Sequence, residues 1–134
     1  MNNYIIIITH DNSNAEGSKD NIIQNVKELY DQGNFSIICT NVNKSDEVIH
    51  ELLRDNNIEF YVAHTDFDKY GGKARRIRNY KIYELVKYCT NVKIIIVGDK
   101  THTDYLYLKD LFYKNKVNYS EITVHQDGYY DILF

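Results

Sequence analysis

The side chains best suited to hold an anion are concentrated in one short segment, Tyr70-Gly71-Gly72-Lys73-Ala74-Arg75-Arg76-Ile77-Arg78-Asn79. Three of the chain's four arginines lie there, directly after a diglycine and at the predicted start of a helix. The first turn of a helix presents unpaired N–H groups and the positive end of the helix dipole, and arginine adds a bidentate pair of donors. These features favour a phosphate or carboxylate ligand.

The alternative for this segment is a solvated basic helix face. The apolar stripe through Ile82 and Val86 extends back to Arg78, which places Arg78 on the side that faces the sheet. An unpaired guanidinium there would be costly to desolvate, so we interpret the segment as an anion site. The groups expected to bind the anion are the side chains of Arg78 and Lys73 and the backbone amides near Gly71 and Gly72. Arg75 or Arg76 is expected to reach the anion from the rim of the site.

More polar side chains follow the predicted strands, at the edge where open parallel sheets bind ligands. They are His10 and Asn12 after the first strand, Thr40 and Asn41 after the second, and Asp99, Thr101 and His102 after the fourth. Loop residues are commonly polar because loops are solvated, so each of these residues alone carries little weight. As a group they are expected to line the rest of the anion site.

A metal centre, a cofactor and a nucleophilic active site are not expected. The run His64-Thr65-Asp66-Phe67-Asp68 alternates possible ligands for a divalent cation, but such a run in an acidic loop is more often incidental. Cys39 and Cys89 fall within or at the end of apolar segments, where a free cysteine acts as a small core side chain. No G-x-S-x-G and no Walker A motif is present.

These candidates need a scaffold, and the chain alternates short β-branched runs with helical stripes from end to end. Strands are predicted at residues 4–9, 35–39, 58–63, 92–97 and 119–124, and the tail, residues 125–134, either adds a short strand or packs on an edge. Helices capped by Ser18, Ser45 and Thr103 are expected between them, and a further long helix after a loop at 64–72. Repeated strand–helix–strand units imply a parallel sheet covered on both faces. We predict one α/β domain over residues 1–134, a Rossmann-like three-layer sandwich with a mainly parallel five-stranded sheet.

Composition and charge restrict the classes of partner. The net charge of −3 and pI of about 5.9 lack the basic excess of a nucleic-acid-binding protein, so any anion must be held locally. No apolar run approaches the ~18 residues of a transmembrane helix, and the N-terminus lacks the basic region of a signal peptide. A cytoplasmic protein is therefore expected. The absence of Pro and the abundance of Asn and Ile indicate AT-rich codons, which fits a phage or mobile element.

The chain holds 13 tyrosines, more than one core can absorb. Most lie in its second half, among them Tyr80, Tyr83, Tyr88, Tyr105, Tyr107, Tyr113, Tyr129 and Tyr130. Exposed aromatic rings either stack on bases or form oligomer interfaces, and the acidic charge favours the interface. A homo-oligomer through a tyrosine-rich surface is expected.

Residues 66–84, Asp-Phe-Asp-Lys-Tyr-Gly-Gly-Lys-Ala-Arg-Arg-Ile-Arg-Asn-Tyr-Lys-Ile-Tyr-Glu, resemble the signature of the YspA-like (YpsA-related) branch of the SLOG superfamily. That branch carries W-D-x-Y-G-K-x-A-G-x-I-R-N-x-x-M in the same place, and the element order matches as well. The resemblance implies a Rossmann-like fold that binds nucleotide-derived ligands. It also implies that Arg78 holds a phosphate or ribose phosphate, that Asn79 bonds sugar hydroxyls or braces the loop, and that Tyr70, Gly71 and Lys73 form the loop before them.

Two segments depart from the family pattern. The family's glycine-rich turn after the second strand is replaced by Thr40-Asn41-Val42-Asn43-Lys44-Ser45-Asp46, which has no glycine. Its G-G-x-G-T segment after the fourth strand is reduced to Gly98-Asp99-Lys100-Thr101-His102-Thr103, and the nearby catalytic Glu of the family's phosphoribohydrolases is missing. Without glycine the backbone approaches a phosphate less closely, so both departures argue against hydrolase activity and for a different ligand.

The sequence thus predicts a protein that senses or sequesters a small phosphorylated, nucleotide-derived ligand. One alternative is an enzyme that cleaves an N-glycosidic bond, for which Asp11, Asp66 or Asp99 would have to supply the carboxylate. Another is a non-catalytic protein whose pocket is vestigial and which interacts with its partner through the tyrosine-rich surface.

Overall fold

The computed structural model describes residues 3–9, 15–89, 91–98, 103–124 and 130–133. Its sheet has six strands in the order β3-β2-β1-β4-β5-β6. Five are parallel, namely β1 (Asn3–Ile8), β2 (Phe35–Thr40), β3 (Tyr61–Ala63), β4 (Asn91–Val97) and β5 (Tyr119–Val124), and β6 (Tyr130–Leu133) pairs antiparallel with β5. The predicted Rossmann-like α/β sandwich is confirmed, and the tail adds a short antiparallel strand at one edge.

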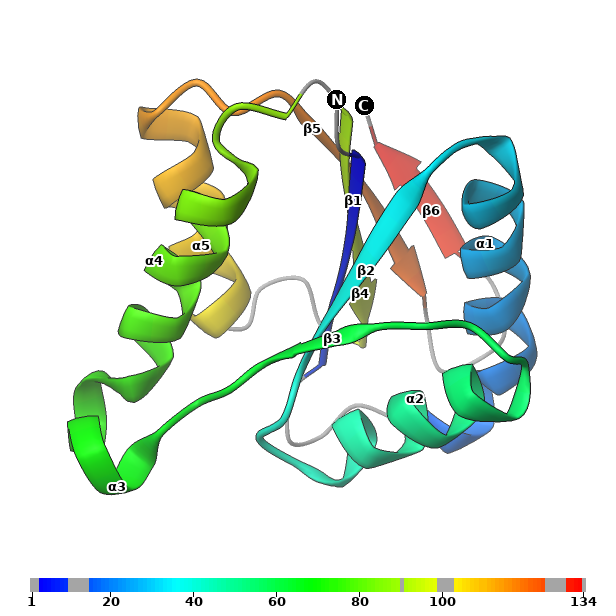
Figure 1. Ribbon diagram of the computed structural model, residues 1–134, viewed down its shortest axis with the longest axis horizontal. Helices are drawn as coiled ribbons and strands as arrows, with labels where there is room; N and C mark the ends of the chain where they lie inside the picture. The colour runs from blue at the N-terminus through cyan, green and yellow to red at the C-terminus, as the bar shows by residue number, and fades with distance from the viewer. Residues whose placement is uncertain (1–2, 10–14, 90, 99–102, 125–129, 134) are drawn as a thin grey trace.

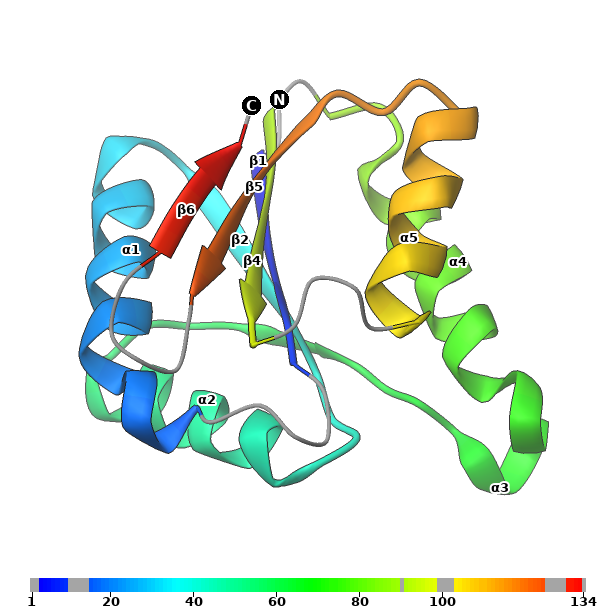
Figure 2. The ribbon, with the colours of Figure 1, turned by 180° about the vertical axis from the view of Figure 1, so that it is seen from behind.

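Helices cover both faces of the sheet (Figure 1). One layer consists of α1 (Lys19–Gln32), preceded by the 3-10 turn η1 (Glu16–Ser18), and α2 (Lys44–Asp55). The opposite layer consists of α4 (Ala74–Val86) and α5 (Thr103–Lys114), and the reverse view shows the same separation (Figure 2). The one-turn helix α3 (Phe67–Tyr70) and the 3-10 turn η2 (Gly71–Lys73) lead into α4. None of the described helices combines the length and hydropathy needed to span a bilayer.

Alternation along the central strands explains why they are apolar without interruption. On β1, Ile5 and Ile7 join the core beneath α1 and α2, while Ile6 and Ile8 join the core beneath α4 and α5. All four are at most 2% exposed. Burying such a side chain contributes about 1.5–3 kcal/mol relative to leaving it exposed, so both faces of the sheet drive folding.

The third strand is shorter than predicted, because the predicted range 58–63 begins within the exit from α2. The Ile58 amide donates to the carbonyl of Leu53, 3.0 Å away, and Asn57 has a φ of 57°. A left-handed residue followed by a bond back to the helix ends α2 with a turn, so extended pairing with β2 starts only at Tyr61. Ile58 is buried in the core even though it lies outside the strand.

The caps of two helices also differ from the prediction. Ser18 stands at the N-cap position of α1, but its side chain makes no capping hydrogen bond. The N-cap of α2 is Asn43 and not Ser45: the Asn43 side chain accepts from the Asp46 amide, and the Asp46 carboxylate accepts from the Asn43 amide. This reciprocal capping box fixes the turn after β2.

Candidate functional site

The three arginines of the predicted anion segment have three different environments, and Arg78 is the most buried. It is 1% exposed, on the sheet-facing side of α4 as predicted. Its guanidinium donates to Asn79 Oδ1 from Nε (3.2 Å) and Nη2 (3.0 Å), to Thr65 Oγ1 (2.8 Å) and to Asp104 Oδ2 (2.5 Å). In this arrangement the guanidinium braces protein groups and is turned away from solvent.

Asn79 completes that brace. Its Nδ2 donates to Asp104 Oδ1 at 2.8 Å and to the Asp104 carbonyl at 3.2 Å, and Asn79 is also 1% exposed. A charged pair this deeply buried stabilises little by itself, but the loss of one partner leaves the other buried and uncompensated. The four residues Arg78, Asn79, Asp104 and Thr65, which we call the brace, therefore lock α4 to the start of α5 and to the loop after β3.

A second polar network holds the turn after β2, the segment that differs from the glycine-rich turn of the SLOG pattern. Asp46, 2% exposed, accepts from the hydroxyls of Thr9 and Thr40 at 2.7 Å each and from the Val42 amide at 2.6 Å. Thr40 also accepts at its carbonyl from His50 Nε2, at 2.8 Å. The predicted site residue Thr40 is thus 2% exposed and ties β2 to α2.

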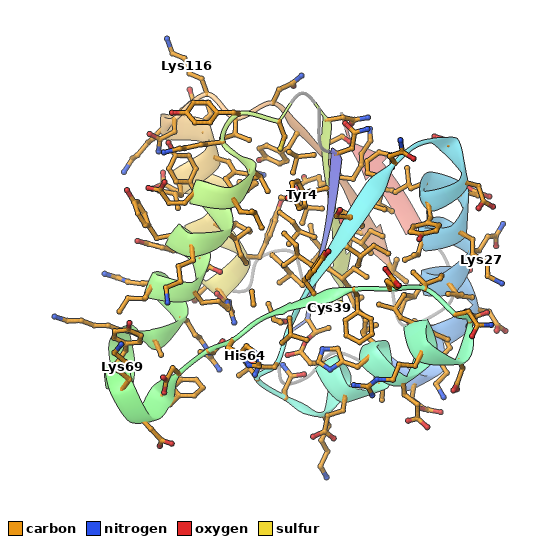
Figure 3. All side chains as sticks on the ribbon, viewed as in Figure 1. Tyr4, Lys27, Cys39, His64, Lys69 and Lys116 are labelled. Atoms are coloured by element: carbon orange, nitrogen blue, oxygen red, sulfur yellow. The ribbon has the colours of Figure 1, made fainter. Side chains whose placement is uncertain are left out.

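The turn after β2 is joined to the loop after β3 by Asn41. Its Nδ2 donates to His64 Nδ1, and its Oδ1 accepts from the Thr65 amide, each at 2.9 Å. Asn41 and His64 are exposed, and Figure 3 places His64 at the edge of the sheet where β3 ends. Thr65 is shared with the brace, so the carboxyl edges of β2 and β3 and the start of α4 are connected through one loop.

Arg75 lies one helical turn before Arg78 and on the same face of α4, since residues three apart on a helix share a face. It is half-buried, and its guanidinium carbon stands 5.8 Å from the centroid of the Phe67 ring. Its Nε is buried and has no hydrogen-bond partner among the residues that the structure describes. Leaving such a donor without an acceptor costs about 1–3 kcal/mol, so the described residues leave one donor of the Arg75 guanidinium unused.

Arg76 points elsewhere. Its guanidinium carbon lies 5.2 Å from the centroid of Tyr107 on α5, and with Lys73 it lines a groove between α4 and α5. The ring of Tyr70 is contacted by Lys69 Nζ at 5.1 Å and Lys81 Nζ at 5.6 Å, which holds α3 against α4. Lys73 and Arg76 are therefore not gathered with Asn41 and His64.

The diglycine has a conformational role. Gly71 adopts a φ of 55° and a ψ of −131°, a conformation that L side chains rarely adopt. Its amide donates to the Phe67 carbonyl and caps α3. Beyond the adjoining backbone, no atom of the described residues lies within 4 Å of where a Cβ on Gly71 or Gly72 would be, so close approach of these residues does not require either glycine.

Several predicted residues lie outside the part of the chain that the structure describes: His10, Asn12, Asp99, Thr101 and His102, and with them Asp11. Of the other carboxylates weighed for catalysis, Asp66 accepts from the Lys69 amide at 3.0 Å and caps α3. Within the described ranges no group of three His, Cys, Asp or Glu side chains is placed to hold a metal ion.

Sequence reasoning missed Asp104 and Asp46, which anchor the two networks. Asp46 had a signal, because Asn43 and an acidic residue three positions later form a capping box. Asp104 had none, since its partners lie 25 and 26 residues earlier in the chain and meet it only when α4 and α5 pack together.

Comparisons with known protein families, curated proteins and solved structures give no match to this chain. The resemblance to the SLOG superfamily rests on the motif at residues 66–84 and stays a prediction.

Proposed function

We propose that the protein binds a small phosphorylated, nucleotide-derived ligand at the carboxyl edge of its sheet and senses or sequesters it without turnover. The observation that carries the proposal is Arg75: a half-buried guanidinium with a buried, unpartnered Nε, at the first turn of a helix. Phosphate oxygens match both the geometry and the charge of this donor.

The surroundings of Arg75 suit the rest of a nucleotide. Phe67, 47% exposed, offers a ring face next to the guanidinium on which a base can stack. Two residues before Phe67, the Thr65 amide donates to the side chain of Asn41, which in turn contacts His64. The side chains of Asn41 and His64 are exposed and accessible to sugar hydroxyls. A hollow of about 490 Å³ beside Asn41, also lined by His50 and Lys44, adds space on the same edge.

In this proposal Arg78 and Asn79 are positioning residues. The brace fixes the loop that carries Thr65 and Phe67 against α4, so the ligand meets a preorganised surface and loses less free energy to ordering on binding. The resemblance to SLOG proteins, in which the matched Arg-Asn pair belongs to the ligand site, supports the same location.

Three further proposals concern the setting of this function. The protein acts in the cytoplasm of a bacterial or phage-infected cell, where signalling nucleotides are present. It forms a homo-oligomer through its tyrosine-rich surface. Nucleic acid and membranes are not partners, in keeping with the net charge of −3.

The test is calorimetric titration with AMP and ADP-ribose, with adenosine as the control that lacks phosphate. We expect saturable binding of the phosphorylated compounds only, and a loss of about tenfold or more for Arg75→Gln, since a hydrogen bond to a charged group contributes about 1.5–3 kcal/mol. The matched control is Arg54→Gln, because Arg54 also stands over a phenylalanine, Phe60, at 5.6 Å but on α2.

Either of two results would overturn the proposal. In the first, the wild-type protein binds no phosphorylated nucleotide. In the second, Arg75→Gln and Arg54→Gln bind equally well. Release of free base during the titration, followed by chromatography, would instead support the N-glycosidic hydrolase.

A further inference from the structure

The outer face of the α4–α5 layer carries exposed apolar side chains that the outer face of α2 does not. The exposed residues of α2 are Lys44, Glu47, Glu51, Arg54 and Asp55, all charged. On α4 and α5 the exposed residues include Tyr80 (50%), Leu85 (52%), Leu106 (44%) and Tyr113 (81%), although both helices also bury apolar side chains against the sheet. A helix with apolar side chains on both faces is typical of one covered on both sides.

Within this face lies the groove between α4 and α5. It has a volume of about 360 Å³ and is lined by Ile77, Tyr80 and Tyr107 with the cations Lys73, Arg76 and Lys81. Among the residues that the structure describes, no acidic side chain lines this groove. An occupant must therefore bring both an apolar side chain and negative charge.

The chain itself supplies both, along one row of α4. Arg76, Tyr80 and Glu84 follow one another at intervals of four, so they form a single exposed row on the helix. Hydrogen bonds from Lys87 and Tyr80 lower the pKa of the Glu84 carboxyl. The row runs from cation through aromatic ring to anion and is self-complementary when reversed.

We propose that the α4–α5 face is a twofold-symmetric interface with a second copy of this chain. The two α4 helices cross antiparallel with the axis at Tyr80, so that Arg76 of each copy meets Glu84 of the other. The inference rests on the proposed self-association and is independent of ligand binding.

This arrangement satisfies both requirements of the groove. The antiparallel order brings Tyr83 of the second copy toward Ile77 in the groove, because residues equidistant from a twofold axis at Tyr80 face each other. A parallel order would instead place the cationic ends of both helices together. The bond between Lys87 and Glu84 (2.7 Å) is exposed, so its partial exchange for Arg76 costs little.

The size of the face is sufficient. Helices α4 and α5 have 13 and 12 residues, about 18–20 Å each at about 1.5 Å per residue. Two such helices packed about 8–10 Å apart present an accessible area on the order of several hundred Å² per copy, the scale of the smaller specific interfaces.

The test is a charge exchange between copies. Arg76→Glu gives a homodimer in which both contacts are acid against acid, and Glu84→Lys one in which both are base against base. An equimolar mixture of the two variants restores two opposite-charge contacts in a heterodimer. Arg54→Glu, a reversal on the opposite layer, is the matched control, and circular dichroism checks that each variant is folded.

Light scattering coupled to gel filtration at about 100 µM should give twice the 15.9 kDa chain mass for the wild type and the Arg54→Glu control. Each single variant should dissociate, with a dimer Kd about tenfold or more weaker, and the mixture should recover the dimer. A monomeric wild type overturns the inference, as does a dimer unaffected by both variants. Monomers that persist in the mixture overturn the antiparallel contact of Arg76 with Glu84. Nucleotide titration of the same variants separates this outcome from failure of the ligand proposal, which depends on Arg75.

Discussion

The substitution Arg78→Met tests whether the brace organises the carboxyl edge. Methionine retains an unbranched apolar stem of similar length but removes the guanidinium and its hydrogen bonds to Asn79, Thr65 and Asp104. The Asp104 carboxylate then stays buried with its cationic partner gone. The free energy of unfolding should fall, and the loop after β3 should lose its attachment to α4.

The magnitude follows from the burial of the pair, whose side chains are 1% and 7% exposed. Removing one partner of so buried a pair costs about 3–5 kcal/mol. At roughly 3–5 °C per kcal/mol for a chain of this size, the midpoint of thermal unfolding should fall by about 9–25 °C. A domain of this length has a total stability of about 5–15 kcal/mol, so the variant should be folded but marginal.

Urea denaturation followed by far-ultraviolet circular dichroism measures this change as a lower midpoint at unchanged slope. The control is Lys114→Met, which breaks the exposed Lys114–Asp110 pair (71% and 56% exposed) and should cost less than about 1 kcal/mol. A loss below about 1 kcal/mol for Arg78→Met would refute the reasoning, because it would mean that the buried pair is dispensable.

Two more predictions concern the turn after β2 and the thiols. Asp46→Ala should lose about 2–4 kcal/mol in the same urea assay, since it removes one half of the capping box of α2 and leaves the Thr40 hydroxyl and the Val42 amide without their acceptor; a loss no larger than that of the exposed Glu47→Ala would contradict this role. Burial raises the pKa of the Cys39 thiol far above its ordinary value, and burial raises that of Cys89 too, although Cys89 is only half-buried. A raised pKa leaves little thiolate at pH 8, so Ellman's reagent should modify Cys89 first and Cys39 only on unfolding; modification of both at similar rates would disprove the burial of Cys39.

The fold was predictable because the signals that determine it are local. Apolar, β-branched runs such as 4–9 and 92–97 have few alternatives to buried parallel strands. The helices between them must then cross over with a right-handed connection, which leaves one topology for each strand–helix–strand unit. The range 58–63 failed in its first half because Ile58 is as apolar as a strand residue, yet its amide closes the end of α2. Ile58 is buried because it closes the turn after α2. Its apolar character alone does not distinguish a buried turn residue from a strand residue.

The candidate site was predictable only in part. The stripe through Ile82 places Arg78 against the sheet, but what Arg78 meets there depends on Asp104, which belongs to another helix. The three arginines are equivalent by composition, and they separate only because helix geometry sends Arg75 and Arg78 to one face and Arg76 to another. Tertiary packing therefore decides which cation remains for a ligand.

Mapping of backbone amide shifts by NMR during a titration with AMP tests the proposed ligand site most directly. The account predicts saturable shifts concentrated at residues 40–41, 64–67 and 74–76, and their loss in Arg75→Gln with retention in Arg54→Gln. Shifts confined to the groove around Ile77 and Tyr107, or no saturable shift in the folded wild-type protein, would contradict a nucleotide site at the carboxyl edge.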